Sequence, residues 1–292
     1  MKPLYLIDAS IYVFRAFYSI PDNFFDKNGN LVNGVYGYTN FLLDFLQVKP
    51  EFVSVAFDES LNTCYRNDIF PVYKANREQP TENIKYQFEK CQEITRLLGL
   101  HNLCLKFYEA DDIIGTLAAE LAADSTMIIV TRDKDLGQLL KPGDQMWDFA
   151  ADQFTDPGRV FDKFGVRCDQ LADFLALAGD AVDNIPGAPG VGAKTAARLL
   201  DYFGTLDNLL ANLDQVPDTK VRGANKLQLT LSDHADMIRI YRQITGIKCD
   251  VPMDVTLEDV RLTPVRADEM TAFCEQLNFG ERLHKRLLAY TA

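Results

Sequence analysis

The sequence predicts an α/β fold with a largely parallel central sheet, followed by a mainly helical second part. Short apolar or β-branched runs alternate with helical patterns in the first 160 or so residues, as in sheets whose parallel strands are joined through helices. Beyond Phe161, helical patterns follow one another with glycines at their ends. The chain has 292 residues, of which 47% are hydrophobic, and no repeat of fixed period, so we expect a compact globular protein.

The expected strands, in chain order, are residues 4–8 (LYLID), 52–58 (FVSVAFD), 103–107 (LCLKF) and 127–131 (MIIVT). Apolar residues at helical spacing predict amphipathic helices over 36–46, 88–100 and 111–123, and later over 168–179, 193–204 and 235–246. A polar segment between residues 59 and 82 carries basic and aromatic side chains together, and we expect it to be exposed.

Composition excludes several classes of protein. Asp8 interrupts the apolar start and no small-residue cleavage site follows, so no signal peptide is predicted, and no apolar run could span a membrane. Six cysteines without CxxC spacing are typical of reduced thiols in a cytoplasmic protein. A net charge of −12 argues against a nucleic-acid partner, unless carboxylates gather on divalent cations and reverse the local field.

Acidic residues recur where the expected strands end, the edge at which open α/β sheets bind ligands. The set comprises Asp8, Asp58, Glu109, Asp111, Asp112, Asp133 and Asp135, and the helical part adds Asp180 and Asp183. One such carboxylate is as readily the N-cap of the next helix, but four successive strand ends are harder to explain in this way. Carboxylates crowded into one pocket repel one another unless a cation compensates, so the pattern predicts a metal cluster.

Such a cluster offers only oxygen ligands, which suit Mg²⁺ or Mn²⁺ and disfavour zinc. Two such ions about 4 Å apart can activate water, hold a phosphodiester and stabilise the leaving oxygen. The chemistry indicated is phosphoryl-transfer hydrolysis. Asp180 and Asp183 would share a helix face because they are three residues apart, although a helix ending at Gly179 would weaken this pairing, and an ordinary solvated face stays open.

A turn rich in glycine and proline, GAPGVGAKT, covers residues 187–195. It is not a P-loop, because Ala193 separates Gly192 from Lys194 and the element before it is helical. The pattern predicts helix, hairpin turn, helix. Backbone amides of Gly190 and Gly192 at a helix N-terminus can hold a phosphate, with Lys194 supplying charge. The alternative is a tight interhelical turn without a ligand.

Together these segments resemble the 5′ nuclease family: the 5′ to 3′ exonuclease domain of bacterial DNA polymerase I, stand-alone bacterial and phage 5′ exonucleases, and eukaryotic flap endonucleases. The resemblance covers nearly the whole chain, through LIDASIYVFRAFY, AFDES, YRNDIFPVYKANR, YEADDIIGTLA, TRDKDLGQLL and LAGDAVDNIPGAPGVGAKTA in order. It implies a PIN-like catalytic domain over residues 1–165, with a helical arch or clamp at about 60–85. It also implies a helical DNA-binding subdomain over 166–292, with a helix-three-turn-helix (helix-hairpin-helix) at about 170–204 and further helices at its C-terminal end.

The resemblance implies roles for individual residues. A first metal site would use Asp8, Asp58, Glu109, Asp111 and Asp112, and a second Asp133, Asp135, Asp180 and Asp183. Arg15, Arg66, Tyr73, Lys74 and Arg77 would lie near the scissile phosphate, while Gly190, Gly192, Lys194 and Thr195 would hold duplex DNA, with a potassium ion on main-chain carbonyls of the hairpin. One departure is Arg132, where the family usually has a small residue, so that the rim of the second metal site would be more basic.

The leading hypothesis is a monomeric, divalent-metal-dependent 5′ to 3′ exonuclease or flap endonuclease. It would cut DNA at flaps, nicks or duplex 5′ ends in replication and repair, and would also cut RNA primers, since an enzyme that contacts the backbone has few means of excluding them. A module that binds branched DNA without cutting is one alternative, and missing carboxylates would mark it, but none is missing. A metal-dependent phosphatase for small molecules is another, but it would leave the arch and the hairpin without a role.

Overall fold

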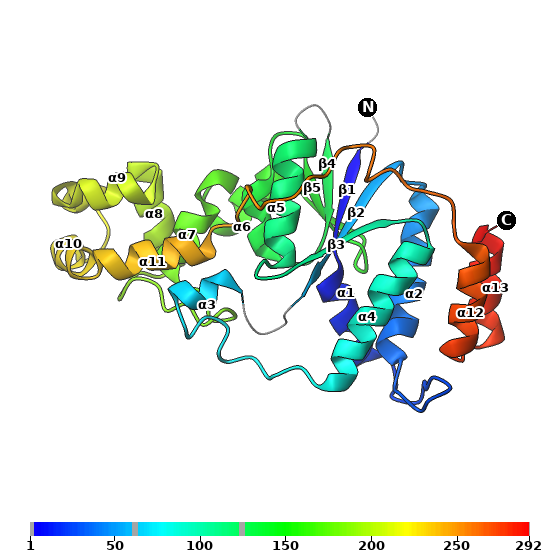
Figure 1. Cartoon of the computed structure of the whole chain (residues 1–292). Coiled ribbons are helices and arrows are strands. Elements are labelled where there is room, and N and C mark those ends of the chain that lie inside the picture. The colour runs from blue at the N-terminus through cyan, green and yellow to red at the C-terminus, as the bar shows by residue number, and fades with distance from the viewer. Residues whose placement is uncertain (1–2, 60–63, 123–125, 292) are drawn as a thin grey trace.

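A six-stranded sheet forms the centre of the computed structural model, which describes residues 3–59, 64–122 and 126–291 (Figure 1). The strands are β1 (Leu4–Asp8), β2 (Phe52–Asp58), β3 (His101–Leu105), β4 (Met127–Val130), β5 (Gln145–Asp148) and β6 (Gln153–Thr155). Their order is β3-β2-β1-β4-β5-β6, with β1 to β5 parallel and β6 antiparallel to β5. The carboxyl ends of β2, β1 and β4 therefore lie side by side at one edge.

Helices connect and follow the strands. Between β1 and β5, in chain order, lie α1 (Ala9–Ser19), α2 (Asn33–Phe45), η1 (Leu46–Val48), α3 (Tyr65–Ile69), α4 (Glu82–Leu97), α5 (Ala110–Leu121) and η2 (Lys134–Leu139). After the sheet come α6 (Pro157–Phe164), η3 (Cys168–Gln170), α7 (Leu171–Ala178), α8 (Ala193–Phe203), α9 (Leu206–Ala211), η4 (Leu213–Thr219), α10 (Ala224–Asp233), α11 (Ala235–Thr245), α12 (Ala267–Gln276) and α13 (Glu281–Thr291).

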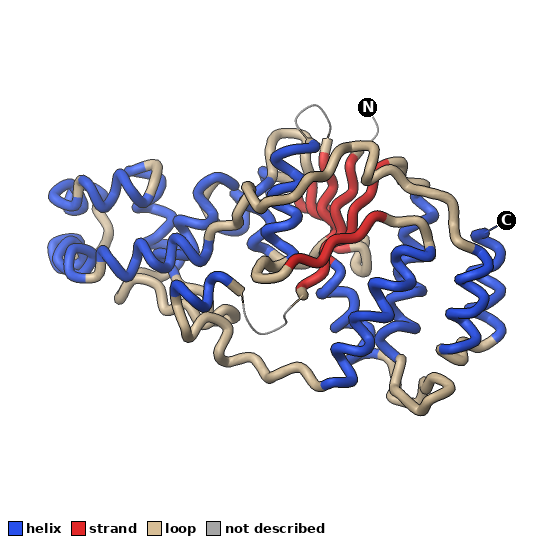
Figure 2. Tube along the Cα trace, in the orientation of Figure 1, coloured by secondary structure: helices blue, strands red, loops and turns tan. Residues whose placement is uncertain are grey.

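Two apolar cores lie on the two faces of the sheet, because successive side chains of a strand point in opposite directions. Leu4 and Leu6 of β1 join the core that contains α5 and α7. Ile7 of β1, with Val53 and Val55 of β2, joins the core that contains α1, α2 and α4. Figure 2 shows the strands as one layer with helices on both sides. This double cover holds the carboxyl edge of the sheet in a fixed position.

The helical second part extends away from one side of the sheet and then returns to it. Helices α8 to α11 form the far end of the molecule, whereas α12 and α13 pack against α4 and α2 on the opposite side (Figure 1). Met270, Phe273 and Leu283 are buried in the same core as α2 and α4. The division at residues 165 and 166 stays a prediction, and the last two helices lie against the sheet part of the chain.

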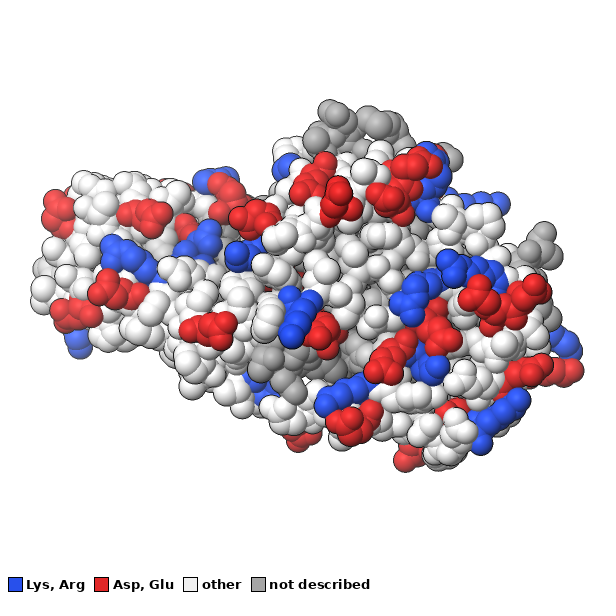
Figure 3. Space-filling view, in the orientation of Figure 1, with Lys and Arg blue, Asp and Glu red and all other residues white. Residues whose placement is uncertain are grey.

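The predicted α/β fold with a mainly parallel sheet and a helical second part is confirmed. The third strand begins at His101, two residues earlier than predicted, where it pairs with Ser54 of β2. Strands β5 and β6 were not predicted, because QMWD and QFT are short and half polar. No helix in the described parts of the chain is long and apolar enough to cross a membrane. On the face shown in Figure 3, acidic and basic side chains are interspersed.

Candidate active site

Acidic side chains gather at the carboxyl edge of the sheet, as the sequence predicts. Five of them line one cavity of about 530 Å³, and each lies at or just beyond the end of a parallel strand: Asp8, Asp58, Glu109, Asp111 and Asp133. Four basic side chains line the same cavity: Arg15, Lys74, Arg77 and Arg132. The sheet topology therefore brings together residues that are far apart in the sequence, because β2, β1 and β4 are neighbours.

Four of these carboxylates, Asp8, Asp58, Asp111 and Asp133, have no ion pair with a basic side chain of the described residues. Three cations of the cavity, Lys74, Arg77 and Arg132, pair with other carboxylates. Burial, Asp58 and Asp133 raise the pKa of Asp8 to about 8. Burial, Asp133 and Asp8 raise the pKa of Asp111 well above its ordinary value, and burial also raises that of Asp58. Crowded, desolvated carboxylates of this kind are stabilised in their charged form by a cation.

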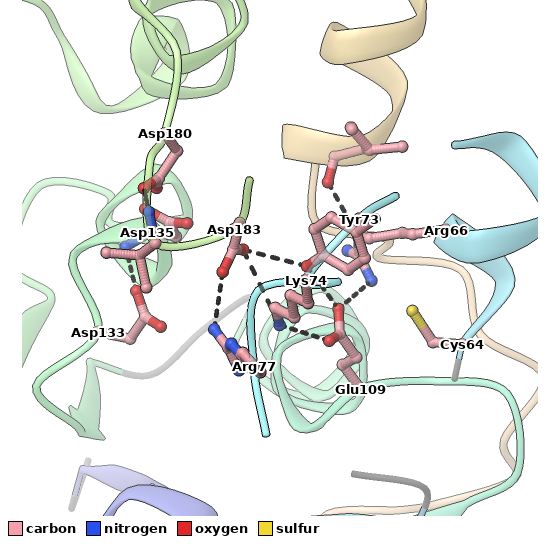
Figure 4. Close-up of polar contacts among 12 residues, drawn as sticks. Cys64, Arg66, Tyr73, Lys74, Arg77, Glu109, Asp133, Asp135, Asp180 and Asp183 are labelled. Carbon is pink, nitrogen blue, oxygen red and sulfur yellow. Dashed lines mark hydrogen bonds and ion pairs between the residues drawn. The ribbon is translucent and has the colours of Figure 1, made fainter. Parts of the chain in front are cut away.

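Glu109, the N-cap of α5, is held by three side chains (Figure 4). Lys74 Nζ lies 2.5 Å from Glu109 Oε1, while Arg66 Nη1 and the Tyr73 hydroxyl donate to Oε2 at 2.8 and 3.0 Å. Burial alone would raise the pKa of Glu109, but Lys74 and Arg66 outweigh it and lower the pKa to about 2. Glu109 is therefore ionised at neutral pH and fixed in orientation.

A second acidic group lies beside this cavity and is bridged by Lys134. Lys134 Nζ is 2.6 Å from Asp180 Oδ2 and 3.2 Å from Asp135 Oδ1. The second distance is an ion-pair contact only, since the buried Asp135 Oδ1 accepts no hydrogen bond. Burial and Asp133 raise the pKa of Asp135 to about 7, against the effect of Lys134. Asp133 and Asp135 are tied together, because the Asp135 amide donates to Asp133 Oδ1 at 2.8 Å.

Asp180 and Asp183 lie in a turn rather than on a helix. Helix α7 ends at Ala178, and two backbone hydrogen bonds of 2.8 Å between Asp180 and Ile185 close the turn that follows. The interpretation that the two aspartates share a helix face is therefore wrong, because Gly179, at φ 83°, ends the helix before them. Asp183 instead faces the segment before α4.

Three residues of that segment contact Asp183. Arg77 Nη2 lies 2.7 Å from Asp183 Oδ1, and the Tyr73 hydroxyl lies 3.1 Å from Oδ2. Lys74 adds a backbone hydrogen bond from its amide to the Asp183 carbonyl, at 3.1 Å, and its ammonium lies 3.9 Å from the carboxylate. Figure 4 shows these side chains between Asp183 and Glu109. The segment thus joins the two acidic groups.

Asp112 and Arg66 differ from their predicted roles. Asp112 is fully buried and does not line the cavity. Its two carboxylate oxygens accept hydrogen bonds from Arg66 Nη1 and Nη2, at 2.7 Å each. Arg66 is 3% exposed, and its remaining donors bond Glu109, the Ile244 carbonyl and the Gly246 carbonyl. All five of its N–H groups are used inside the protein. Arg66 is therefore not placed to contact DNA, and Asp112 is not placed to bind a metal.

The segment before α4 is exposed at residues 75–79, as predicted, but some of its other side chains are buried. Cys64 and Tyr73 are 6% and 4% exposed, because the segment packs against α5 and the turn after α7. Its described part contains the five-residue helix α3 and turns up to α4, while residues 60–63 of the predicted arch lie outside the described residues. It borders a second cavity of about 1030 Å³, which shares Lys74, Arg77 and Glu109 with the first.

The predicted hairpin turn lies at the N-terminus of α8 and directly follows the closed turn that carries Asp180 and Asp183. Gly190 has φ 78°, which only glycine adopts without strain. Gly192 is the N-cap of α8, with Lys194 exposed and Thr195 donating its amide to the Gly192 carbonyl at 2.9 Å. An added Cβ at Gly192 would meet no atom within 4 Å, so the fold leaves open space beside this backbone.

The donor set fits a hard divalent cation by its chemistry, since it consists of carboxylate oxygens, and Asp8, Asp58, Asp111 and Asp133 have no ion pair with a basic side chain of the described residues. As the side chains stand, no three acidic, histidine or cysteine side chains of the described residues are grouped closely enough to hold one ion. Lys74 and Lys134 instead neutralise part of the set. The metal ligands therefore remain a proposal that rests on charge and donor type.

Thr131 and Lys134 contact the acidic groups but were not predicted from the sequence. Thr131 Oγ1 donates to Asp8 Oδ2 at 3.0 Å and accepts from the Asp133 amide at 2.9 Å, so it connects the ends of β1 and β4. Lys134 stands between Asp133 and Asp135 in the sequence, and that position was the one signal that could have identified it.

Comparison with known proteins identifies relatives over almost the entire chain. A model of the family described as 5′-3′ exonuclease, N-terminal resolvase-like domain, matches residues 3–165, and one described as 5′-3′ exonuclease, C-terminal SAM fold, matches residues 166–268. DNA polymerase I of Rhizobium leguminosarum is 35% identical over 285 residues, which are 94% of this chain and 27% of the relative. A 5′-3′ exonuclease of Buchnera aphidicola is 29% identical over 96% of this chain and 98% of its own length. The chain thus spans under a third of that polymerase and nearly all of the exonuclease.

Solved structures share the fold. T5 5′-exonuclease with bound divalent metal ions (zinc) gives a TM-score of 0.68 at 17% identity, with all of both chains covered. The catalytic core of Rad2 in complex with DNA substrate gives a TM-score of 0.65 at 16% identity, covering 99% of this chain and 92% of that one.

Proposed function

The chain belongs to the 5′-3′ exonuclease family, and on that basis we propose that it is a divalent-metal-dependent 5′ nuclease acting on DNA flaps, nicks or duplex 5′ ends. The observation that carries this proposal is the cavity in which Asp8, Asp58, Asp111 and Asp133 crowd together without basic partners. Bound metal in one similar structure and bound DNA in another support it.

The proposed metal ligands fall into two groups, to be filled by Mg²⁺ or Mn²⁺. The first comprises Asp8, Asp58, Glu109 and Asp111, and the second Asp133, Asp135, Asp180 and Asp183. Bound ions would supply an activated water and charge neutralisation at the cleaved phosphodiester. The role of Arg66 is to fix Glu109 and to neutralise Asp112, which holds the start of α5 in place.

Lys74 and Arg77 are proposed to bind the phosphate that is cut. They are the cations of the segment before α4, and they now pair with Glu109 and Asp183. When DNA and cations bind, Lys74 and Arg77 would leave Glu109 and Asp183 and bind phosphate oxygens. The two carboxylates would then bind the metal ions. Tyr73 would stay as an anchor of that segment, since its hydroxyl lies between Glu109 and Asp183. Arg15, exposed on α1, would add a further phosphate contact.

The hairpin turn is proposed to hold duplex backbone at a second place. Gly192 is the N-cap of α8 and Gly190 lies two residues before it, at a helix N-terminus, where a phosphate is favoured; Lys194 and Thr195 lie in the first turn. A potassium ion on main-chain carbonyls would complete this clamp. Because the closed turn after α7 joins the clamp to Asp180, the two places would grip one DNA at a fixed spacing.

In a cell, such an enzyme would act as a monomer in the cytoplasm, in DNA replication and repair. It would also remove RNA primers, because contacts to the backbone do not distinguish RNA strongly from DNA.

The test uses a duplex with a labelled 5′ flap and Mg²⁺, and compares the unmodified chain with Asp133→Asn. We expect short labelled products from the unmodified chain and at least a hundredfold lower rate from the variant. Binding without cutting by both proteins would instead identify a branched-DNA-binding module. Hydrolysis of small phosphate esters without DNA cleavage would identify a phosphatase.

A further inference from the structure

Arg132 is a cation of the active-site cavity to which the proposed mechanism gives no role. It lies two residues after β4, directly before Asp133, and its side chain lines the cavity of about 530 Å³. The side chain is 55% exposed, so it faces solvent as well as the cavity.

Arg132 has only one partner among the described residues, and that partner uses only part of the guanidinium. Its Nε lies 3.0 Å from Asp148 Oδ2, at the end of β5, and Asp148 does not line the cavity. The four N–H groups on Nη1 and Nη2 have no described partner within the protein, in contrast to Arg66, whose donors are all used. An exposed pair of this kind is weak and exchanges readily.

The position of Arg132 relative to the two cavities indicates which part of a substrate it would meet. Lys74 and Arg77 line both the larger cavity next to α4 and the smaller cavity of the carboxylates. Arg132 and Arg15 line only the smaller one. A strand that enters through the larger cavity would therefore meet Lys74 and Arg77 before it meets Arg132.

The positive charge of Arg132 would attract a backbone phosphate in the smaller cavity. The strand continuing past the cleaved phosphate would bring a second backbone phosphate into the cavity, apart from the phosphate that the bound cations would neutralise. A planar guanidinium with free paired donors binds a phosphate through two parallel hydrogen bonds, which Asp148 does not prevent because it occupies Nε alone.

We propose that Arg132 is a positioning residue that binds a backbone phosphate flanking the cleaved one, in the part of the smaller cavity that the larger cavity does not share. The inference rests on the proposed nuclease function. Arg132 is held near Asp148 in the free protein and turns its Nη groups to the phosphate when DNA binds.

The test compares three variants with the unmodified chain. Arg132→Gln removes the proposed contact. Asp148→Asn removes the charge that holds Arg132 but can still accept the hydrogen bond from the Ala151 amide. Arg266→Gln is the matched control, since Arg266 is 62% exposed with one ion pair, 3.7 Å from Glu269, in the C-terminal part of the chain. KM and kcat are measured on a 5′-flap duplex with Mg²⁺, and the dissociation constant is measured by fluorescence anisotropy in EDTA over a range of salt.

We expect Arg132→Gln to raise KM about tenfold with kcat within about twofold, and to reduce the slope of log affinity against log salt by about one unit. Asp148→Asn should leave KM unchanged or lower, and Arg266→Gln should match the parent. An unchanged KM and salt slope in Arg132→Gln would overturn the inference while leaving the nuclease function standing. The same defect in Asp148→Asn would also overturn it, because Arg132 would then only stabilise the end of β5. A parent that binds but does not cut would remove the nuclease function, and the anisotropy slopes alone would then decide the role of Arg132.

Discussion

Replacing Arg66 by methionine should destabilise the protein by about 3–5 kcal/mol, the usual cost of removing one partner from a buried ion pair. Arg66 is 3% exposed and its two Nη groups each approach an oxygen of Asp112 at 2.7 Å. Asp112 is fully buried, and after the substitution it would keep only weaker partners, including the Lys248 amide at 2.9 Å. The uncompensated carboxylate, rather than the lost arginine itself, carries most of the cost.

Urea denaturation at pH 7 measures this effect. With a slope of about 3 kcal/mol per molar urea, the midpoint should fall by about 1–2 M. The control is Arg77→Met, which removes an arginine whose side chain is 47% exposed and should change stability by less than about 1 kcal/mol. The reasoning is refuted if Arg66→Met keeps the stability of the parent and loses DNA affinity with a flatter salt dependence. That result would restore the phosphate contact that the sequence suggests for Arg66.

Other substitutions test other parts of the structure. Gly192→Ala should leave the urea midpoint unchanged, because φ is −94° and an added Cβ meets nothing within 4 Å, but it should weaken duplex binding in anisotropy titrations. Gly190→Ala should also weaken duplex binding and should in addition cost about 1 kcal/mol of stability, because φ is 78°. Equal urea midpoints for the two variants would contradict this. Asp26→Asn should cost about 1–2 kcal/mol at pH 7, since hydrogen bonds from Asn30 and Tyr86 lower the pKa of Asp26 although burial acts to raise it. Because that pKa is lowered, the difference from the parent should be complete above about pH 4 and shrink as the pH falls further, and a pH-independent difference in urea melts would argue against it. Two glycines inserted after Asp183 should shift or abolish the cut position mapped on a sequencing gel, whereas an unchanged position would mean that the closed turn does not set the spacing.

The sequence predicted the central strands because each is short, apolar and followed by an acidic residue. Strands β1, β2 and β4 are buried on both faces, so their hydrophobic runs are continuous and easily recognised. Strand β5 begins and ends with polar side chains, and β6 has only three residues, so neither produces such a run. Their pairing depends on neighbours that the local sequence does not reveal.

Within the site, the sequence predicted which residues lie at the sheet edge but not how basic residues are distributed among them. The positions of Asp8, Asp58 and Asp133 follow from the parallel strand order, which a β/α alternation already suggests. The burial of Arg66 does not follow, because it depends on carbonyls of Ile244 and Gly246 from a distant part of the chain. Long-range contacts of this kind separate structural arginines from those free to meet a substrate.

Direct metal binding tests the central claim that the carboxylates without basic partners, Asp8, Asp58 and Asp111 of the first group and Asp133 of the second, are metal ligands. Mn²⁺ is titrated into the DNA-free protein and bound ion is measured by electron paramagnetic resonance, for the parent, Asp8→Asn and a control, Asp236→Asn, whose exposed carboxylate pairs only with Arg239 among the described residues. The account predicts saturable Mn²⁺ binding by the parent and control, and at least tenfold weaker binding by Asp8→Asn. No saturable binding by the parent, or equal affinity in Asp8→Asn, would contradict it.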